Sequence, residues 1–371
     1  MRLFTCRSCG QTVFFENILC ESCGHALGYL SRARELLTLE PHEDGYKRLG
    51  ARQTYRYCDN ATDGVCNWLI PTASTDRFCT ACQPNRIIPD LSVPEALGQW
   101  QRLEAAKHRL FYTLGALGLP TRSYLDDPEH GLAFEFLADP PGIGPRVLTG
   151  HEEGLITINL AEADDAQRET FRAAMGEPYR TLLGHFRHEI GHYFWNLLLR
   201  DTGRLDDSRT MFGDEEQDYA AALQAHYQNG PPADWQDNYI SAYAASHPWE
   251  DFAETWAHYL HIVDTLETAS AFGLRIHPRN TNQRLLHADI RFNPHEASSI
   301  DSLIIAWLPL TLAVNSLNRS MGLADLYPFT IAPRVIEKLG FIHSLVHEKS
   351  PAEPASVDET AEPRSLDTAA I

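Results

Sequence analysis

Most of this sequence lacks cysteine, because all eight cysteines among its 371 residues lie before residue 83. The remaining part can form neither a disulfide nor a thiolate metal site. Its composition, with 43% hydrophobic and 22% charged residues, is that of a globular protein. The clustering therefore indicates a cysteine-dependent module followed by a larger part that folds around an ordinary apolar core.

Positive charge is also scarce. The chain holds 31 Lys and Arg against 50 Asp and Glu, a formal net charge of −19. Residues 1–100 hold 10 basic and 11 acidic residues, so about −18 of that charge falls on residues 101–371. An acidic body argues against nonspecific binding of nucleic acid or of an anionic membrane, because both are drawn to basic surfaces. It does not exclude a local basic site.

Long hydrophobic runs are missing as well. Met1 to Cys6 contain no apolar segment of the kind found in secretory signals. The longest apolar stretch, Leu303 to Val314, is interrupted by Pro309 and is shorter than the ~20 residues that a membrane span needs. We therefore expect a buried core helix there and a cytoplasmic protein with no membrane partner, whose cysteines stay reduced and available to metals.

The cysteines form two sets of four. A CxxC pair places two thiolates on one tight turn, at the separation of adjacent corners of a tetrahedral zinc site. The first set has two such pairs ten residues apart, which predicts a zinc ribbon, whereas the second set combines a looser pair with one CxxC. The sets are Cys6, Cys9, Cys20 and Cys23, and then Cys58, Cys66, Cys79 and Cys82.

Sites made only of thiolates leave no open coordination position, so we expect two structural zinc ions here. Disulfide bonding is the alternative, and the lack of a signal sequence argues against it. Modules of this kind also dock protein or nucleic acid. The near-neutral charge of the first 100 residues favours protein over nucleic acid as the partner.

The chain changes character after residue 85. Ser92 to Glu95 read as a capping box with Pro94 in the first turn, and apolar residues then recur at helical spacing until Gly118. Two strand-like stretches follow: Leu132–Phe136 is one, and Arg146–Leu148 with Leu155–Asn159 predict a hairpin. These patterns predict a helix followed by a small β-sheet.

From about Arg168 to residue 345 the pattern is helical, with breaks at Gly213, Gly230 and His277-Pro278. The residues from Lys349 on lack periodicity and are rich in Pro, Ala, Ser, Glu and Thr, which is typical of disorder. The overall prediction is an α+β protein. It consists of a zinc-ribbon module at 1–90, a mostly helical domain with a small β-sheet at 91–345, and a disordered acidic tail at 346–371.

The helical region contains the sequence His188-Glu189-Ile190-Gly191-His192. Two histidines four residues apart project from one face of a helix, as two ligands of a single Zn²⁺ must. Glu189 lies about 100° further round, where it can take a proton from the attacking water and pass it to the leaving amine. Gly191 lowers helix stability by about 1 kcal/mol relative to alanine, which suggests close approach of another backbone or of substrate.

A catalytic zinc needs a third protein ligand and one open position. Glu250 and Glu254 are one helical turn apart, in a predicted helix whose segment begins at Ser246, 58 residues after His188. Such a pair suits one ligand and one carboxylate that accepts the free N–H of a ligating histidine. Two alternatives remain open. Asp251 could be the ligand instead, or the carboxylates could be an exposed acidic first turn that complements the helix dipole.

Three segments, His185–Tyr193, Ile240–Tyr243 and His247–Tyr259, resemble the putative zinc-binding metallopeptidase family that carries an N-terminal zinc ribbon. The resemblance spans Cys6 to about residue 345. The HExxH motif with a downstream glutamate also resembles the gluzincins. A tyrosine seven residues before the Glu-x-Phe-Ala-Glu segment is similar to the lethal-factor type of these enzymes.

By that resemblance Glu250 is the third zinc ligand and Glu254 holds a ligating histidine. Tyr243 stabilises the oxyanion, although it could equally be a tyrosine of the helix core. We interpret His185 as a packing residue. We interpret His247 as part of a turn or as a substrate contact. The zincin fold also implies that the strand Leu155–Leu160 forms the rim of the cleft, where a peptide can pair with it.

These features predict a zinc-dependent metallopeptidase that hydrolyses peptides or proteins with one catalytic and two structural zinc ions. Two other functions remain open. One is a zincin-fold amidase acting on a non-protein substrate, and the other is a binding protein whose ribbon docks a partner and whose zinc site is inactive. The presence of Glu189 argues against the binding protein with an inactive zinc site, because a structural zinc site needs no base.

Overall fold

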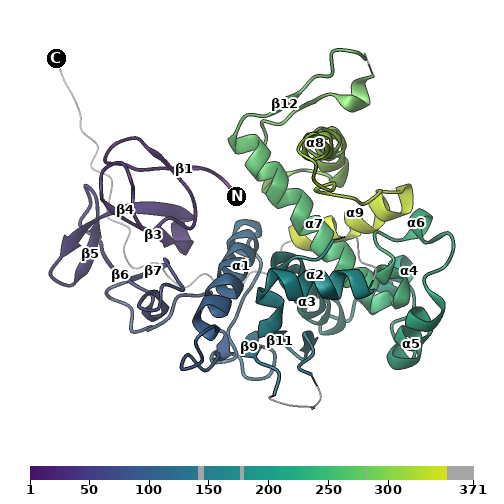
Figure 1. The fold of residues 1–371 in the computed structure, drawn as a ribbon, viewed down its shortest axis with the longest axis horizontal. Helices are drawn as coiled ribbons and strands as arrows, with labels where there is room; N and C mark the ends of the chain where they lie inside the picture. Colours follow the sequence, from purple (N-terminus) through teal and green to yellow (C-terminus); the bar gives the residue numbers. More distant parts are fainter. Residues whose placement is uncertain (141–145, 176–178, 282, 349–371) are drawn as a thin grey trace, which may run out of the picture.

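The computed structural model describes residues 1–140, 146–175, 179–281 and 283–348 (Figure 1). The protein has a cysteine-rich β module followed by a mostly helical part with a small sheet, which is the predicted α+β class. The module begins with the short strands β1 and β2, continues into a five-stranded antiparallel sheet, and carries two short 3-10 turns. Its elements are β1 (Phe4–Thr5), β2 (Thr12–Val13), β3 (Ala26–Leu30), η1 (Ser31–Ala33), β4 (Glu35–His42), β5 (Gly45–Arg48), β6 (Thr54–Tyr57), η2 (Asp59–Ala61) and β7 (Leu69–Pro71).

The five-stranded sheet between the two cysteine sets was not predicted. Its strands run β3-β4-β5-β6-β7, and the first strand comes back close to the last. The Tyr29 N–H donates to the Asn67 carbonyl at 2.9 Å, and Gly28 packs against Leu69. A Cβ at Gly28 would lie 2.6 Å from the Leu69 side chain, so this contact needs glycine. The sheet joins the two metal sites into one module.

The second sheet has the order β10-β11-β9-β8. Three strands are parallel, β8 (Asn85–Ile87), β9 (Ala133–Leu137) and β11 (Leu155–Asn159), and β10 (Gly150–Glu152) is antiparallel at one edge. The predicted hairpin is therefore confirmed, but its first strand is β10 and not Arg146–Leu148. Residues 146–149 form no strand. Glu153 and Gly154 both have positive φ, and two such residues in a row are typical of the tight turns that join hairpin strands.

Three helices carry the helical part: α1 (Ala96–Leu117), α3 (Leu182–Trp195) and α7 (Pro248–Ala271). Gly118, with a φ of 69°, ends α1 as predicted, but the expected capping box does not form, since Glu95 precedes the helix without a side-chain cap. Helices α3 and α7 cross at Gly191. A Cβ there would lie 3.0 Å from the Ala253 Cα, so Gly191 serves backbone approach between helices.

The remaining elements surround these helices. They are η3 (Leu160–Ala163), α2 (Asp165–Met175), the π-helical turn η4 (Asn196–Arg200), α4 (Leu205–Phe212), α5 (Tyr219–Asn229), α6 (Trp235–Asn238), η5 (Tyr243–Ser246), β12 (Arg275–Ile276), η6 (Arg284–Leu286), β13 (Ala288–Asp289), η7 (Pro294–Glu296), α8 (Ile300–Ser320) and α9 (Pro333–His347). The helix breaks at Gly213 and Gly230 are confirmed. The β12–β13 hairpin lies within the region predicted as helical.

The apolar stretch from Leu303 to Val314 lies in α8, which packs on α7 and α9. The expectation of a buried core helix is only half right, because Ile305, Leu308 and Leu312 are exposed. By length and composition α8 could cross a membrane, but a single such helix is weak evidence, since core helices of soluble proteins pass the same test.

The two parts of the chain share one apolar core, which includes Cys66 and Trp68 of the module and Trp100 and Phe134 of the helical part. Strand β8 follows directly after Cys82 and already pairs with β9, so the predicted boundary at residue 90 falls after the first strand of the second sheet. Helix α9 extends to His347, and the rest of the predicted tail, from residue 349 on, lies outside the described residues.

Candidate metal centres

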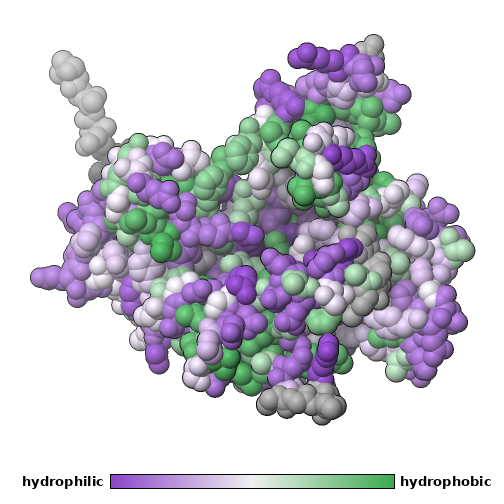
Figure 2. Space-filling model, viewed as in Figure 1, coloured by the Kyte–Doolittle hydropathy of each residue, from purple (hydrophilic) through white to green (hydrophobic). Residues whose placement is uncertain are grey.

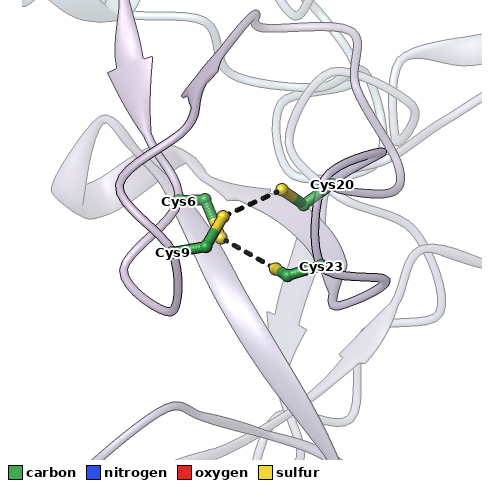
Figure 3. Close-up of side chains that lie close together, drawn as sticks. All are labelled: Cys6, Cys9, Cys20 and Cys23. Carbon is green, nitrogen blue, oxygen red and sulfur yellow. Dashed lines mark hydrogen bonds between the residues drawn. The ribbon is translucent and has the colours of Figure 1, made fainter.

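The first cysteine set sits on two similar turns that face each other (Figure 3). Cys6 and Cys9 lie between β1 and β2, and Cys20 and Cys23 lie just before β3. In each turn the N–H of a following glycine, Gly10 or Gly24, donates to the carbonyl of the first cysteine, and each glycine has the positive φ that such a turn needs. The backbone therefore aims four thiols at one point.

The sulfur distances fit zinc. The Sγ atoms of Cys6 and Cys23 are 3.6 Å apart, and those of Cys9 and Cys20 are 3.7 Å apart. Four sulfurs bound tetrahedrally at ~2.3 Å lie roughly 3.8 Å from one another. Disulfide sulfurs would be ~2.05 Å apart, and all eight cysteines are free thiols. The cysteines therefore do not form the disulfide bonds considered as an alternative.

The second cysteine set lies deeper in the molecule. All four thiols are buried and close enough together to hold one ion, and the Sγ atoms of Cys66 and Cys79 are 3.7 Å apart. Backbone N–H groups of Trp68 and Cys79 donate to Cys66 and Cys58, which stabilises thiolates. Buried charges need partners, and zinc supplies the partner that four clustered thiolates require.

His108 of α1 also reaches the second cysteine set. Its Nε2 lies 3.5 Å from the Cys82 Sγ, and its ring is tilted against that of Trp68 with the centroids 5.4 Å apart. Glu104, one turn earlier and fully buried, accepts from the Lys107 ammonium at 2.7 Å. The second site is thereby connected through α1 to the sheet of the helical part. Sequence reasoning missed this contact, because His108 and Cys82 are brought together only by the fold.

The His and Glu residues predicted as ligands of a catalytic zinc come together between α3 and α7. The His188 Nε2 lies 3.2 Å from the His192 Nε2 and 2.9 Å from the Glu250 Oε2, and the His192 Nε2 lies 3.6 Å from the same oxygen. Three atoms bound to one zinc at ~2.0–2.1 Å in a tetrahedron would be roughly 3.3 Å apart. The Glu250 Oε2 is buried, and no described residue donates a hydrogen bond to it. Zinc therefore fits these three residues.

Each candidate ligand is held in place by other side chains. The His188 Nδ1 donates to the Glu254 Oε1 at 2.8 Å, and the Ser241 hydroxyl donates to the other Glu254 oxygen at 2.6 Å. Burial acts to raise the pKa of Glu254, but the hydrogen bond and charge of His188 outweigh it and hold the value at about 2. An anionic Glu254 fixes His188 in the tautomer that leaves Nε2 free for a metal.

His192 is positioned differently, by aromatic stacking. Its Nδ1 is buried and has no hydrogen-bond partner within the described residues. Its ring lies 3.9 Å from the Trp249 ring and stacks at 6.1 Å on His151 from β10. Burial lowers the pKa of His151 to about 3, so this ring stays neutral at physiological pH. His151 thus brings the edge strand of the sheet next to the metal site.

Glu189 and Tyr243 also lie at this centre. Glu189 is 8% exposed as a residue, and its carboxylate forms no hydrogen bond or ion pair with any described residue, which leaves it free to exchange a proton. The Tyr243 ring centroid is 5.9 Å from that of His188. Burial, reinforced by the negative charge of Glu250, raises the Tyr243 pKa well above its usual value, so its hydroxyl stays a neutral donor.

A second tyrosine, which sequence reasoning missed, contacts the centre. The Tyr219 hydroxyl at the start of α5 donates to the Glu250 Oε1 at 2.6 Å. One Glu250 oxygen is thereby held by Tyr219 while the other is left for a metal. The signal available in the sequence was only an Asp218 helix cap followed by an aromatic residue, and it does not reveal a contact 31 residues away.

The other candidate residues lie elsewhere. The Asp251 Oδ2 accepts from Lys338 of α9 at 2.6 Å, so this carboxylate is used within the core and is not part of the cluster. His185 lies 3.3 Å from Glu162, away from the metal. His247 accepts from the Trp249 N–H, as a helix cap does, which matches the turn interpretation of this residue.

The strand expected at the rim of the cleft needs correction. Leu155–Asn159, which is β11, has strands on both sides, so its edges are occupied. The outer edge belongs to β10, which pairs only with β11 among the described residues and contacts α3. A backbone edge next to the metal-binding helix is therefore available on β10, one strand further out than predicted.

Comparison with known proteins identifies the family of each part of the chain. A family described as putative zinc-binding metallo-peptidase matches residues 96–345, and a zinc-ribbon domain family matches residues 3–93. Uncharacterized proteins of Mycobacterium bovis and Mycobacterium tuberculosis are 42% identical over 357 residues, which cover 96% of this chain and 98% of theirs. No solved structure matches the chain.

Proposed function

Because this chain belongs to the putative zinc-binding metallopeptidase family, we propose that it cleaves peptide bonds at the centre formed by His188, His192 and Glu250. Three donors leave a fourth position open, which a catalytic zinc needs and a structural zinc does not. The observation that carries the proposal is the Glu189 carboxylate on the same helix as His188 and His192, which has no partner among the described residues, since a group that moves protons must be free to exchange them.

When bound, zinc would supply Lewis-acid polarisation of a carbonyl and of a water molecule. Glu189 accepts the proton of the attacking water and returns it to the amine that leaves. Tyr243 donates its hydroxyl to the carbonyl oxygen as that oxygen gains negative charge, and its raised pKa keeps the proton available. Tyr219 and Glu254 act through Glu250 and His188, and they are positioning residues.

The outer edge of β10, which pairs with no strand in the described part of the chain, supports a peptide over a small amide as substrate. An extended peptide can add to such an edge through backbone hydrogen bonds, which places a scissile bond next to the metal irrespective of its side chains. His151 lies within this strand and stacks on His192, so the edge and the candidate ligands are in direct contact. A non-protein amide would gain nothing from a strand edge.

We further propose one catalytic and two structural zinc ions in a protein of the cytoplasm. The two cysteine clusters support the structural ions because four thiolates close the coordination sphere. Eight free thiols support a reducing compartment, since secreted proteins tend to oxidise such pairs.

The test is digestion of a proteome-derived peptide library by the wild type and by Glu189→Gln. The substitution keeps the shape of the side chain and removes the base, so we expect cleavage to fall by roughly 10²- to 10⁴-fold. Glu129→Gln, on an exposed loop, is the matched control and should cleave at the wild-type rate. Equal cleavage by wild type and Glu189→Gln would refute the proposal. A wild type that spares every peptide but hydrolyses acylated small molecules would favour the amidase.

A second function, docking of a partner by the ribbon, is supported by one observation. Phe14, Ile18 and Leu19, between the two cysteine turns, are exposed by 53%, 65% and 48%. Clustered exposed apolar residues are typical of protein interfaces. Ile18→Ser should abolish partner capture while zinc content and peptide cleavage stay unchanged. If capture persists, the ribbon is only structural.

A further inference from the structure

One segment is positively charged, whereas the protein as a whole is strongly negative. Residues 272–293 hold four arginines and one aspartate, a net charge of +3 in a chain of −19, so the rest carries −22. Arg275 and Arg291 both pair with Asp289. Arg279 and Arg284 have no ion-pair partner in the parts of the chain that the structure describes. Two guanidinium groups are thus left to face solvent.

The same segment exposes apolar side chains. Leu285 is 77% exposed, and Phe272 and Leu274 at the end of α7 are exposed as well. The hairpin formed by β12 and β13 packs against α8, whose exposed apolar residues Ile305, Leu308 and Leu312 recur every three to four positions along one helical face. Arginines and large apolar residues therefore share one region, hereafter the hairpin patch, made of residues 272–281, residues 283–293 and that face of α8.

The hairpin of the hairpin patch projects from the rest of the molecule. In Figure 1 the hairpin extends beyond the body, above the end of α7. In Figure 2 hydrophilic and hydrophobic residues lie side by side on this projection. Charges interact over a Debye length of about 8 Å at physiological ionic strength, so a projecting segment responds to its own charge more than to the distant acidic body.

We propose that the hairpin patch binds the surface of an anionic lipid bilayer. Arginines attract acidic headgroups while leucine and phenylalanine enter the boundary of the acyl chains, and surface-bound segments combine both features. A nucleic acid would use the arginines but leave the leucines in water. A symmetric contact with a second copy would set two positive patches against each other. The total charge predicted that the protein has no membrane partner, whereas the local charge of the hairpin patch favours one.

Cosedimentation of the full chain with vesicles tests this proposal. We expect binding to phosphatidylcholine vesicles that contain phosphatidylglycerol, weakening as salt is raised, and little binding to pure phosphatidylcholine. Each basic residue near an anionic surface contributes about fivefold to partitioning, so Arg279→Gln with Arg284→Gln should bind about 25-fold more weakly. Leu285→Ser with Leu312→Ser should lose roughly tenfold or more, because the apolar insertion is removed.

The matched control is Arg52→Gln with Leu125→Ser, which removes an exposed arginine and an exposed leucine outside the hairpin patch. It should bind like the wild type, and all variants should keep the wild-type zinc content and circular dichroism. Three results would overturn the proposal: no binding to the anionic vesicles at low salt, equal loss in the control, or binding to an anionic polymer such as heparin without binding to vesicles. Dimerisation abolished by Leu312→Ser, without vesicle binding, would also overturn it.

Discussion

The two kinds of candidate zinc centre in this protein differ in what surrounds the donors. The cysteine centres present four thiols each, and their neighbours are backbone N–H groups that stabilise thiolate charge. The centre between α3 and α7 presents three donors, and its neighbours include a carboxylate and two tyrosines that can exchange or donate protons. Four identical donors close a site, whereas three donors beside titratable groups fit a reaction.

The centres also differ in how they are held. The second cysteine set is enclosed by the core and by His108, so its ion would be part of the fold. At the His and Glu centre the ligands are already fixed by Glu254, Tyr219 and Trp249. A site whose ligands are oriented by other side chains can lose its metal and keep its shape. This difference is what the following predictions test.

The largest expected effect concerns the buried cysteine centre. Cys66→Ser should remove the second structural zinc and unfold the protein, because such ions contribute on the order of 10 kcal/mol to folding. Cys9→Ser, in the exposed turn, should cost much less and leave the helical part folded. Thermal unfolding followed by circular dichroism compares the two. Equal melting temperatures would show that the first site is as essential as the second.

Replacing Glu250 and Asp251 of α7 one at a time distinguishes a zinc ligand from a residue that stabilises the fold. Glu250→Ala should lose one of three zinc ions and keep the fold. Asp251→Ala should keep all three ions but lose about 3–5 kcal/mol of stability, because Lys338 is left buried without its partner. Zinc content and urea unfolding of both variants measure this. Loss of one zinc from Asp251→Ala instead would make Asp251 the ligand.

The two tyrosines should act on different quantities. Tyr243→Phe should lower kcat by roughly 10²- to 10³-fold with unchanged zinc affinity, because it removes a donor to the oxyanion. Tyr219→Phe should weaken zinc binding by about 10- to 100-fold, because Glu250 loses the bond that orients it. Steady-state kinetics and zinc titration of the two variants test this. The reverse pattern would exchange their roles.

Acid should destabilise the helical part through His258. Burial lowers the pKa of this histidine from 6.5 to about 4, so the folded state disfavours its protonation. Stability is therefore complete above pH 6.5 and falls as the pH drops toward 4, by about 3 kcal/mol for this group. His258→Gln should flatten the unfolding free energy over that range. An unchanged pH profile would assign the acid sensitivity to other groups.

The local parts of the centre could be predicted from sequence, and its long-range parts could not. The pairing of His188 with His192 follows from helical spacing, which fixes side-chain direction within one or two turns. The roles of Glu250 and Glu254, on another helix, came instead from the resemblance to a known family. Tyr219 and His151 reach the centre from α5 and β10, and no periodicity links them to it. Only the packing of separate elements brings them together.

In the fold, too, some features could be predicted from the sequence and others could not. Gly118 and Gly191 predicted a helix end and a close helix contact, because glycine is required by backbone geometry at both places. The sheet β3–β7 was missed although Asp44-Gly45 is a hairpin signal. Leu36, Leu37 and Leu39 are buried in succession on β4, so the alternation that marks a half-exposed strand is absent there.

Selective removal of one zinc tests most directly the claim that the three-donor centre works while the cysteine centres hold the fold. Treatment with a chelator should remove one ion quickly, abolish peptide cleavage in proportion, and leave the circular dichroism unchanged. One added equivalent of zinc should restore cleavage. If cleavage survives the loss of the first ion, or if the fold is lost together with that ion, the division of roles proposed for these centres is wrong.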